Sequence, residues 1–245
     1  MTHLETEIQL LKRNIVEMWN IVNNQLDKSQ QTISNFDKDL IHNIKVNEKM
    51  VDTFELMIDR DCENILALYN PVAIDLRFVL SVLKINYNLE RIGDYASGIS
   101  KLVDDLENPI SEELINSTHI FVMFNLCQEL LKDSLNSFET ENNWETRNIL
   151  GRDKAINKIN KEATKIVADY IIKKPEDVLI AMNVLSVIRK LERVGDHIQN
   201  IAEELIFYME AKVLKHQKKK KIKWFVILTD VTQNLYRDMV IIVNI

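Results

Sequence analysis

The chain has 245 residues, of which 46% are hydrophobic and 28% are charged. It contains only four glycines and three prolines, whereas all-β and α/β folds need more turn residues, so the composition favours helices. The net charge of −6 argues against a dedicated nucleic-acid binder. No apolar run approaches the ~20 residues that span a bilayer, and the polar N-terminus does not resemble a signal peptide. We therefore expect a cytoplasmic protein, with Cys62 and Cys127 as reduced, buried thiols.

Hydrophobic residues at steps of three and four predict six helices. They cover about residues 2–33, 37–69, 71–106, 111–141, 142–174 and 175–216. Asn35 or Asp37 can cap the second helix, and Pro71 suits the first turn of the third. Ser111 can cap the fourth helix, and Asn142 with Glu145 resembles a capping box for the fifth.

The pattern gives three helices, a short linker at 107–109, and three helices again. Chains made only of helices with short connections fold as antiparallel bundles. We therefore predict an all-α fold of two tandem three-helix bundles, with domains at 1–108 and 109–216. Residues 217–245 form a tail outside the bundles, where a run of lysines precedes two apolar segments that are typical of strands.

An internal repeat supports the two-bundle prediction. The segment from Glu90 to Asp94 returns almost unchanged as the segment from Glu192 to Asp196, so the two copies are related by a shift of 102 positions. Hydrophobic and small residues around each copy form a heptad-like seam that includes Gly93 or Gly195. The two carboxylates of each copy share one helix face, beside this seam.

A second acidic pair precedes each helix break. Counted from the breaks at 70 and 174, these pairs should lie level with the repeated motifs. The pairs are Glu48 with Asp52, opposite Glu90 with Asp94, and Asp153 with Asn157, opposite Glu192 with Asp196. Four carboxyl groups in the first half, and three with an amide in the second, suit hard or intermediate cations. The alternative is a solvated acidic edge with Arg91 and Arg193 as salt-bridge partners.

Other candidate residues carry weaker signals. His197 could join the second cluster, but Tyr95 occupies the corresponding position of the first copy, so we expect a surface histidine. Asp75 and Arg77 are expected to serve as a helix-start acid and its salt-bridge partner. The sequence lacks the Glu-x-x-His pairs of di-iron oxidases and any glycine-rich phosphate loop.

Asn70 to Arg77, followed by Leu89 to Asp94, resembles the PhoU family of phosphate-uptake regulators. The second half resembles the second repeat of that family through Leu191 to Asp196 and Asn200 to Glu203. The resemblance covers about residues 2–216, and the tail has no place in the family pattern. It implies a cytoplasmic, dimeric, non-enzymatic protein that represses phosphate-starvation signalling. The implied partners are the phosphate ABC transporter and a membrane sensor kinase, and we expect the protein to associate with membranes only peripherally.

The resemblance also implies multinuclear metal clusters, with iron first and Mg, Mn or Zn as alternatives. The matching positions are Glu48, Asp52, Glu90 and Asp94 in the first repeat, and Asp153, Asn157, Glu192 and Asp196 in the second. Asn157 stands where the family usually has Asp, so the second cluster lacks one charge.

Two other function classes stay open at this point. One is a metal-dependent helical-bundle enzyme, against which the missing Glu-x-x-His and the missing nucleophile–base pair both argue. The other is a helical adaptor that binds no metal. Metal content would separate the adaptor from the regulator, and turnover assays would identify the enzyme.

Overall fold

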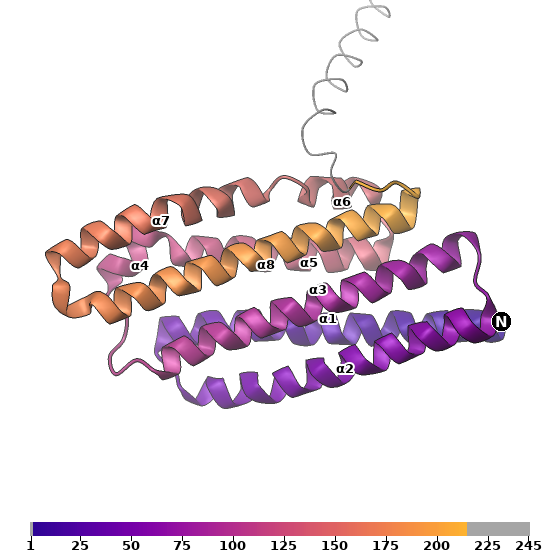
Figure 1. The fold of residues 1–245 in the computed structure, drawn as a ribbon, viewed down its shortest axis with the longest axis horizontal. Helices are drawn as coiled ribbons and strands as arrows, with labels where there is room; N and C mark the ends of the chain where they lie inside the picture. The colour runs from indigo at the N-terminus through magenta and orange to yellow at the C-terminus, as the bar shows by residue number, and fades with distance from the viewer. Residues whose placement is uncertain (1, 215–245) are drawn as a thin grey trace, which may run out of the picture. The chain divides into compact units, whose positions relative to one another are not determined.

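The structure is a computed structural model that describes residues 2–214. These residues form eight α-helices and one short 3₁₀ helix, with no strand among them (Figure 1). The α-helices are α1 (His3–Asn35), α2 (Asp39–Tyr69), α3 (Ala73–Asp104), α4 (Glu112–Thr118), α5 (Ile120–Thr140), α6 (Asn143–Ile149), α7 (Asp153–Lys173) and α8 (Val178–Glu210). The 3₁₀ helix η1 (Pro175–Asp177) joins α7 to α8.

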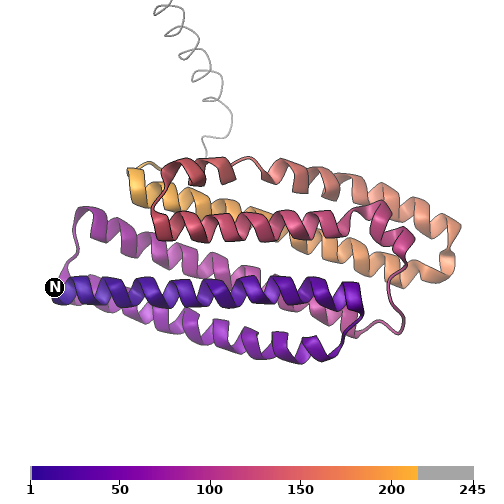
Figure 2. The ribbon, with the colours of Figure 1, turned by 180° about the vertical axis from the view of Figure 1, so that it is seen from behind.

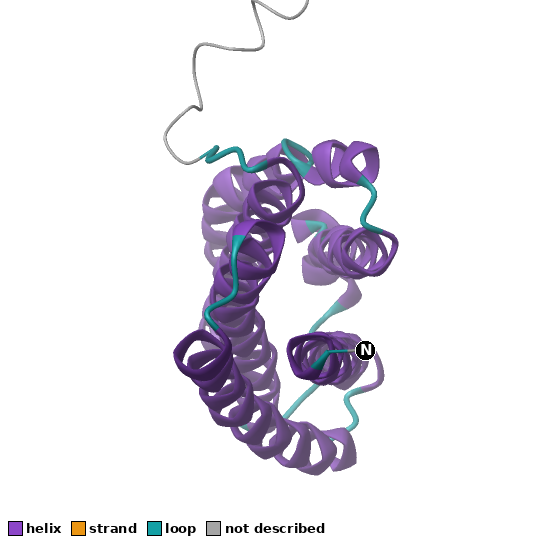
Figure 3. Cartoon of the chain, turned by 90° about the vertical axis from the view of Figure 1, so that its right-hand side faces the viewer, coloured by secondary structure: helices purple, strands orange, loops and turns teal. Residues whose placement is uncertain are grey.

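Two three-helix bundles follow one another along the chain, which confirms the predicted fold class. The first consists of α1, α2 and α3. The second is built on α5, α7 and α8, and the short helices α4 and α6 complete it at its two ends (Figure 2). The described residues up to Lys212 form one compact unit, because α3 packs along α8 and α1 packs along α5. Figure 3 shows the helices of this unit end-on.

Two of the predicted helices are each divided into two. His119 adopts a left-handed conformation with φ of 53° and separates α4 from α5, and Gly151, with φ of 88°, lies between α6 and α7. The predicted caps at these helices are present: Ser111 accepts a hydrogen bond from the backbone of Leu114, and Asn142 accepts two from the start of α6. The six-helix prediction was therefore wrong in number, although the caps at Ser111 and Asn142 are confirmed.

Several helix ends also differ from the prediction. Pro71 precedes α3 and is not part of it, because Val72 is the N-cap residue. The last helix ends at Glu210, where Ala211 turns the backbone left-handed with φ of 56°, so the helix does not continue to 216. The tail predicted at 217–245 lies outside the described residues.

The seam predicted around each repeated motif is buried in the structure. In α3 it consists of Val79, Val82, Asn86, Leu89, Gly93, Ala96, Ser100 and Val103, and in α8 of Ala181, Val184, Ile188, Leu191, Gly195, Ile198, Ala202 and Leu205. A Cβ atom built on Gly93 would lie 3.5 Å from Val51 of α2, and one on Gly195 would lie 3.1 Å from Ile156 of α7. Both glycines thus allow close helix packing.

A larger side chain at Gly195 should weaken the second bundle. We expect Gly195→Leu to lower the free energy of unfolding by about 1–3 kcal/mol, because Ile156 already fills the space that the new side chain would enter. Gly98→Leu is the matched control, since its Cβ would meet only the flexible end of Lys190. Urea denaturation of both variants tests this, and equal losses in stability would contradict it.

Aromatic side chains link the two bundles near their ends. Trp19 of α1 lies 5.7 Å from Phe138 of α5, and Phe138 lies 6.1 Å from Phe78 of α3. Phe78 contacts Tyr208 of α8 edge-on, with 5.4 Å between the ring centroids. The four aromatic residues therefore come from four helices, two in each bundle, and join the bundles through one apolar cluster.

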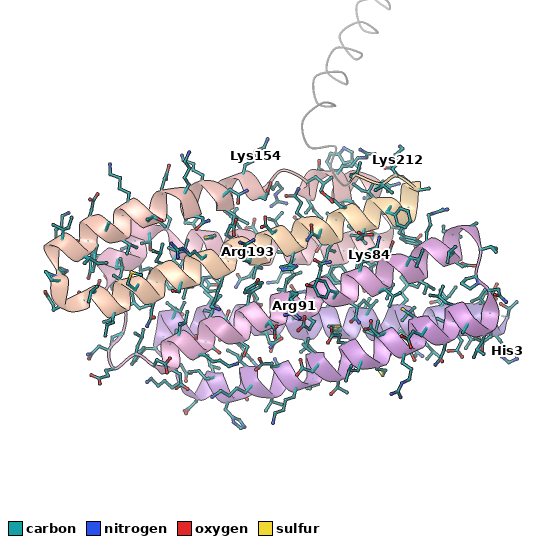
Figure 4. The ribbon with its side chains drawn as sticks, viewed as in Figure 1. His3, Lys84, Arg91, Lys154, Arg193 and Lys212 are labelled. Atoms are coloured by element: carbon teal, nitrogen blue, oxygen red, sulfur yellow. The ribbon has the colours of Figure 1, made fainter. Side chains whose placement is uncertain are left out.

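Helices α3 and α8 run antiparallel, and their polar contacts follow a two-fold pattern. The Asn88–His197 contact is a hydrogen bond of 2.8 Å. The equivalent positions in the other repeat are Lys190, for Asn88, and Tyr95, for His197. These two residues are also in contact, because the Lys190 amine lies over the Tyr95 ring, 5.9 Å from its centroid. The local two-fold axis passes between the midpoints of the two repeated motifs. Figure 4 shows Arg91 and Arg193 midway along α3 and α8.

Candidate functional site

The repeated motif of α3 lies level with the acidic pair of α2, as predicted. The hydroxyl of Ser97 donates a 2.7 Å hydrogen bond to Glu48, one turn beyond Asp94. Burial is the main cause of the raised pKa of Asp52, and the charges of Glu48 and Asp94 raise it further. The three carboxylates are therefore close enough to interact. Three of the four carboxyl groups predicted for the first half therefore lie together across the α2–α3 hairpin, and Glu90 adjoins them through Asp94.

Two further acidic residues extend this face of α2. Glu55 and Asp59 follow Asp52 at steps of three and four, which places them on the same helix face. Burial raises the pKa of Glu55, and Asp59, Asp52 and Asp94 raise it further. Asp59 also accepts a 2.9 Å hydrogen bond from the amide of Asn86 on α3. Neither residue was predicted from the sequence, although the spacing of Glu48 and Asp52, extended along α2, indicates both.

Glu90 is the most perturbed carboxyl group of the cluster. Its side chain is only 10% exposed, so it lies deeper than the position beside the core that was predicted. Burial, followed by the charge of Asp94, raises its pKa to about 7 from the usual 4.5. Within the described residues its buried Oε2 atom accepts no hydrogen bond of good geometry, although the Arg91 guanidinium lies 2.9 Å away as an ion pair. Such an oxygen favours either a proton or a nearby cation.

An arginine inside each motif supplies positive charge to its acidic pair. The Arg91 Nε atom lies 2.9 Å from Glu90 Oε2, and its Nη1 atom donates a 3.1 Å hydrogen bond to Asp94. Arg193 repeats the arrangement more loosely, at 3.7 Å from both Glu192 and Asp196. The ion pairs that the sequence offered as an alternative reading are therefore present in this structure.

The second cluster carries fewer charges than the first. Ile156 faces Gly195, so α7 lies level with the second motif as α2 does with the first. The amide of Asn157 donates a 3.1 Å hydrogen bond to Asp153. Helix α7 has Asn160 and Thr164 where the same register places Glu55 and Asp59 on α2. Burial and the charge of Asp196 raise the pKa of Glu192.

A cleft of about 480 Å³ opens beside the first acidic cluster. Glu48 and Asp52 line it on α2, together with Lys45, Lys49 and other basic residues. Glu48 additionally lies 3.5 Å from the Lys101 amine. Small ions can therefore reach this edge of the cluster from the solvent.

The donor chemistry of the first cluster fits an oxygen-preferring cation. Its six carboxyl groups crowd one face, three of them have raised pKa values, and one buried oxygen lacks a hydrogen bond. In residues 2–214, however, no three His, Cys, Asp or Glu side chains converge as ligands of one metal ion. Arg91 instead holds Glu90 and Asp94, and a bound cation would take over that role.

Two residues outside the clusters have other positions than predicted. His197 is partly buried and not fully exposed as predicted: its ring lies between α8 and α3, bonded to Asn88 and packed near Tyr95. Arg77 donates a 3.2 Å hydrogen bond to the backbone carbonyl of Tyr208, so it links the bundles through the end of α8. Cys62 and Cys127 are free, buried thiols, as predicted.

None of the helices in residues 2–214 combines the length and hydropathy that a membrane crossing requires. A family model for the PhoU domain matches the chain twice, at residues 15–103 and 120–205. One match lies in each three-helix bundle, and each includes one copy of the repeated motif.

Known relatives and solved structures agree with this match. A phosphate-specific transport system accessory protein PhoU homolog from Borreliella burgdorferi is 31% identical over 208 residues, which cover 83% of this chain and 93% of the relative. PhoU homolog 1 from Thermotoga maritima is 28% identical over 214 residues, covering 87% and 91%. The crystal structure of PhoU from Pseudomonas aeruginosa aligns with a TM-score of 0.78 at 25% identity, covering 86% of this chain and all of that one. Both relatives are named as accessory proteins of the phosphate-specific transport system. The chain belongs to the PhoU family.

Proposed function

We propose that this protein is a cytoplasmic regulator of phosphate uptake that represses phosphate-starvation signalling when phosphate is plentiful. Its partners would be the phosphate ABC transporter and the membrane sensor kinase, and it would act as a homodimer. The observation that carries the proposal is the pair of PhoU domains, together with relatives named for the phosphate-specific transport system. Long amphipathic helices with charged outer faces are suited to contacting helices or loops of such partners.

The acidic clusters would hold metal ions that brace neighbouring helices. Glu48, Asp52, Glu90 and Asp94 would hold the first cluster of ions, with Glu55 and Asp59 adjoining it. Iron is the first candidate, and Mg, Mn or Zn are the alternatives. The bound ions would replace Arg91 as the positive charge between α2 and α3, and so fix the shape of the face presented to a partner.

Metal binding should depend on the first motif more than on the second. We expect Glu90→Gln with Asp94→Asn to abolish the stronger site. The first site is the stronger one because the second half lacks three of the carboxylates that the first half has. Circular dichroism should show that the bundle stays folded. The matched control is Glu192→Gln with Asp196→Asn, which should retain most of the metal. Elemental analysis of the purified proteins measures their metal content. Equal metal content in wild type and both variants would contradict the assignment of these residues as metal ligands.

Deleting the gene is the test of the regulatory role. We expect phosphate-scavenging genes to be expressed in phosphate-rich medium in the deletion strain, and wild-type protein to restore repression. Protein with Glu192→Ala and Asp196→Ala should restore it only in part, since the loss of a brace alters regulation without removing the protein. Reporter expression and immunoblots of protein level are the measurements. Unchanged expression of these genes in the deletion strain would contradict the regulatory role and favour a helical adaptor.

A further inference from the structure

The outer face of α7 carries four lysines in one line. Lys154, Lys158, Lys161 and Lys165 follow one another at steps of four, three and four, which keeps them on one face of the helix. At a rise of 1.5 Å per residue, this lysine line is about 16 Å long. All four side chains are exposed, and Figure 4 shows Lys154 projecting away from the ribbon at the outer edge of the second bundle.

The lysine line forms no ion pair with acidic groups of the described residues. No carboxylate of residues 2–214 lies within 4.0 Å of any of the four amines, including that of Glu162, which shares α7 with them. Most other lysines in this part of the chain do form ion pairs. These are Lys12, Lys45, Lys84, Lys101, Lys132, Lys174 and Lys212. Although the net charge of the chain is −6, the described residues thus include a basic face whose four amines form no ion pair with them.

Exposed apolar side chains lie at the end of the same helix. Ile172 continues the lysine line seven residues beyond Lys165 and is 77% exposed. The short helix η1 then turns the chain into α8, whose second residue, Leu179, is 76% exposed. Met182, one turn further along α8, is 47% exposed. The hairpin of α7 and α8 therefore ends in an apolar tip next to the lysine line.

We propose that the lysine line and the apolar tip bind a membrane surface that contains anionic phospholipids. A straight row of exposed amines on one helix face matches a flat layer of phosphate headgroups. Lysines near such a surface each strengthen binding, and exposed apolar side chains beside them enter the headgroup region. The contact is peripheral and stands independently of the regulatory role proposed above.

Vesicle sedimentation with the full-length protein tests the proposal. We expect binding to vesicles of phosphatidylcholine mixed with phosphatidylglycerol, no binding to phosphatidylcholine alone, and loss of binding as salt is raised. Replacing the four lysines of the line with glutamine should weaken binding roughly 100-fold or more, since each lysine near the surface contributes about a fivefold factor. The matched control replaces four exposed basic residues elsewhere with glutamine: Arg13, Lys49, Arg60 and Lys132. It causes the same change in net charge and should bind vesicles nearly as wild type does.

The remaining outcomes are also decisive. Equal weakening in the control, or full binding by the lysine-line variant, would overturn the proposal by placing the contact elsewhere on the chain. Wild-type protein that binds polyglutamate but no vesicles would overturn it in favour of an acidic protein partner. Ile172→Ser with Leu179→Ser should bind at low salt but detach at lower salt than wild type does, as expected if the tip enters the headgroup region. Circular dichroism confirms that each variant is folded.

Discussion

Replacing Trp19 with alanine is expected to lower the free energy of unfolding by about 3–5 kcal/mol. Trp19 is fully buried and is among the largest buried side chains of the described residues. It packs against Phe138 across the boundary between the bundles, so the cavity would open where α1 meets α5. Because that contact joins the two halves, the variant should also unfold with reduced cooperativity. Urea denaturation followed by circular dichroism and by fluorescence measures both effects.

Trp144 provides the matched control for Trp19. It is 71% exposed at the start of α6, so Trp144→Ala removes the same side chain without opening a cavity and should change stability by less than about 0.5 kcal/mol. Trp19→Phe should cost less than Trp19→Ala, because it keeps most of the apolar volume and removes an indole N–H that has no partner in the described residues. Similar losses for the alanine variants of Trp19 and Trp144 would contradict the packing argument.

Glu90→Gln is expected to stabilise the metal-free protein above neutral pH. Burial and Asp94 raise the pKa of Glu90 to about 7 in the folded state, against the usual 4.5, so the folded chain binds this proton more tightly than the unfolded chain. A raised carboxyl pKa contributes stability below about pH 4.5 that is lost as the pH rises through about 7. The loss in wild type can reach about 3 kcal/mol. Gln keeps the shape without the charge, so it avoids this loss.

Urea denaturation at several pH values in the presence of a chelator measures the effect. Wild type and Glu90→Gln should have similar stability near about pH 4 and diverge towards about pH 8. Glu113→Gln is a control of opposite sign, because a hydrogen bond from Lys174 lowers the pKa of Glu113. Its small contribution is present at high pH and lost on acidification. Parallel pH profiles for wild type and Glu90→Gln would show that Glu90 is not held in a charge-disfavouring site.

Features that depend on a repeated local pattern could be predicted from the sequence. The shift of 102 positions identified both motifs, and the spacing of apolar residues identified both buried seams. Counting residues from each helix break placed Glu48 level with the first motif, because helix rise is nearly constant. The charge of Arg91 next to two carboxylates also made its ion pairs foreseeable.

Features that depend on packing between the bundles could not be predicted in this way. His197 contacts Asn88, more than a hundred residues away, and nothing in either local pattern indicates that α3 and α8 are neighbours. The left-handed break at His119 occurs without a glycine or proline to mark it. Gly151 did carry a signal, because a lone glycine often accompanies a positive φ.

The two-fold pattern between α3 and α8 makes this boundary resemble that of a symmetric homodimer. In such an isologous contact the same patch is used on both sides, so each partner carries both halves of the interface. Here Asn88 with His197, and Lys190 with Tyr95, occupy equivalent places on the two sides. The residues at these equivalent places differ between the repeats, so each of the two contacts needs one residue from each repeat. The contact between the bundles thus has the positional symmetry of a homodimer interface without its identity of residues.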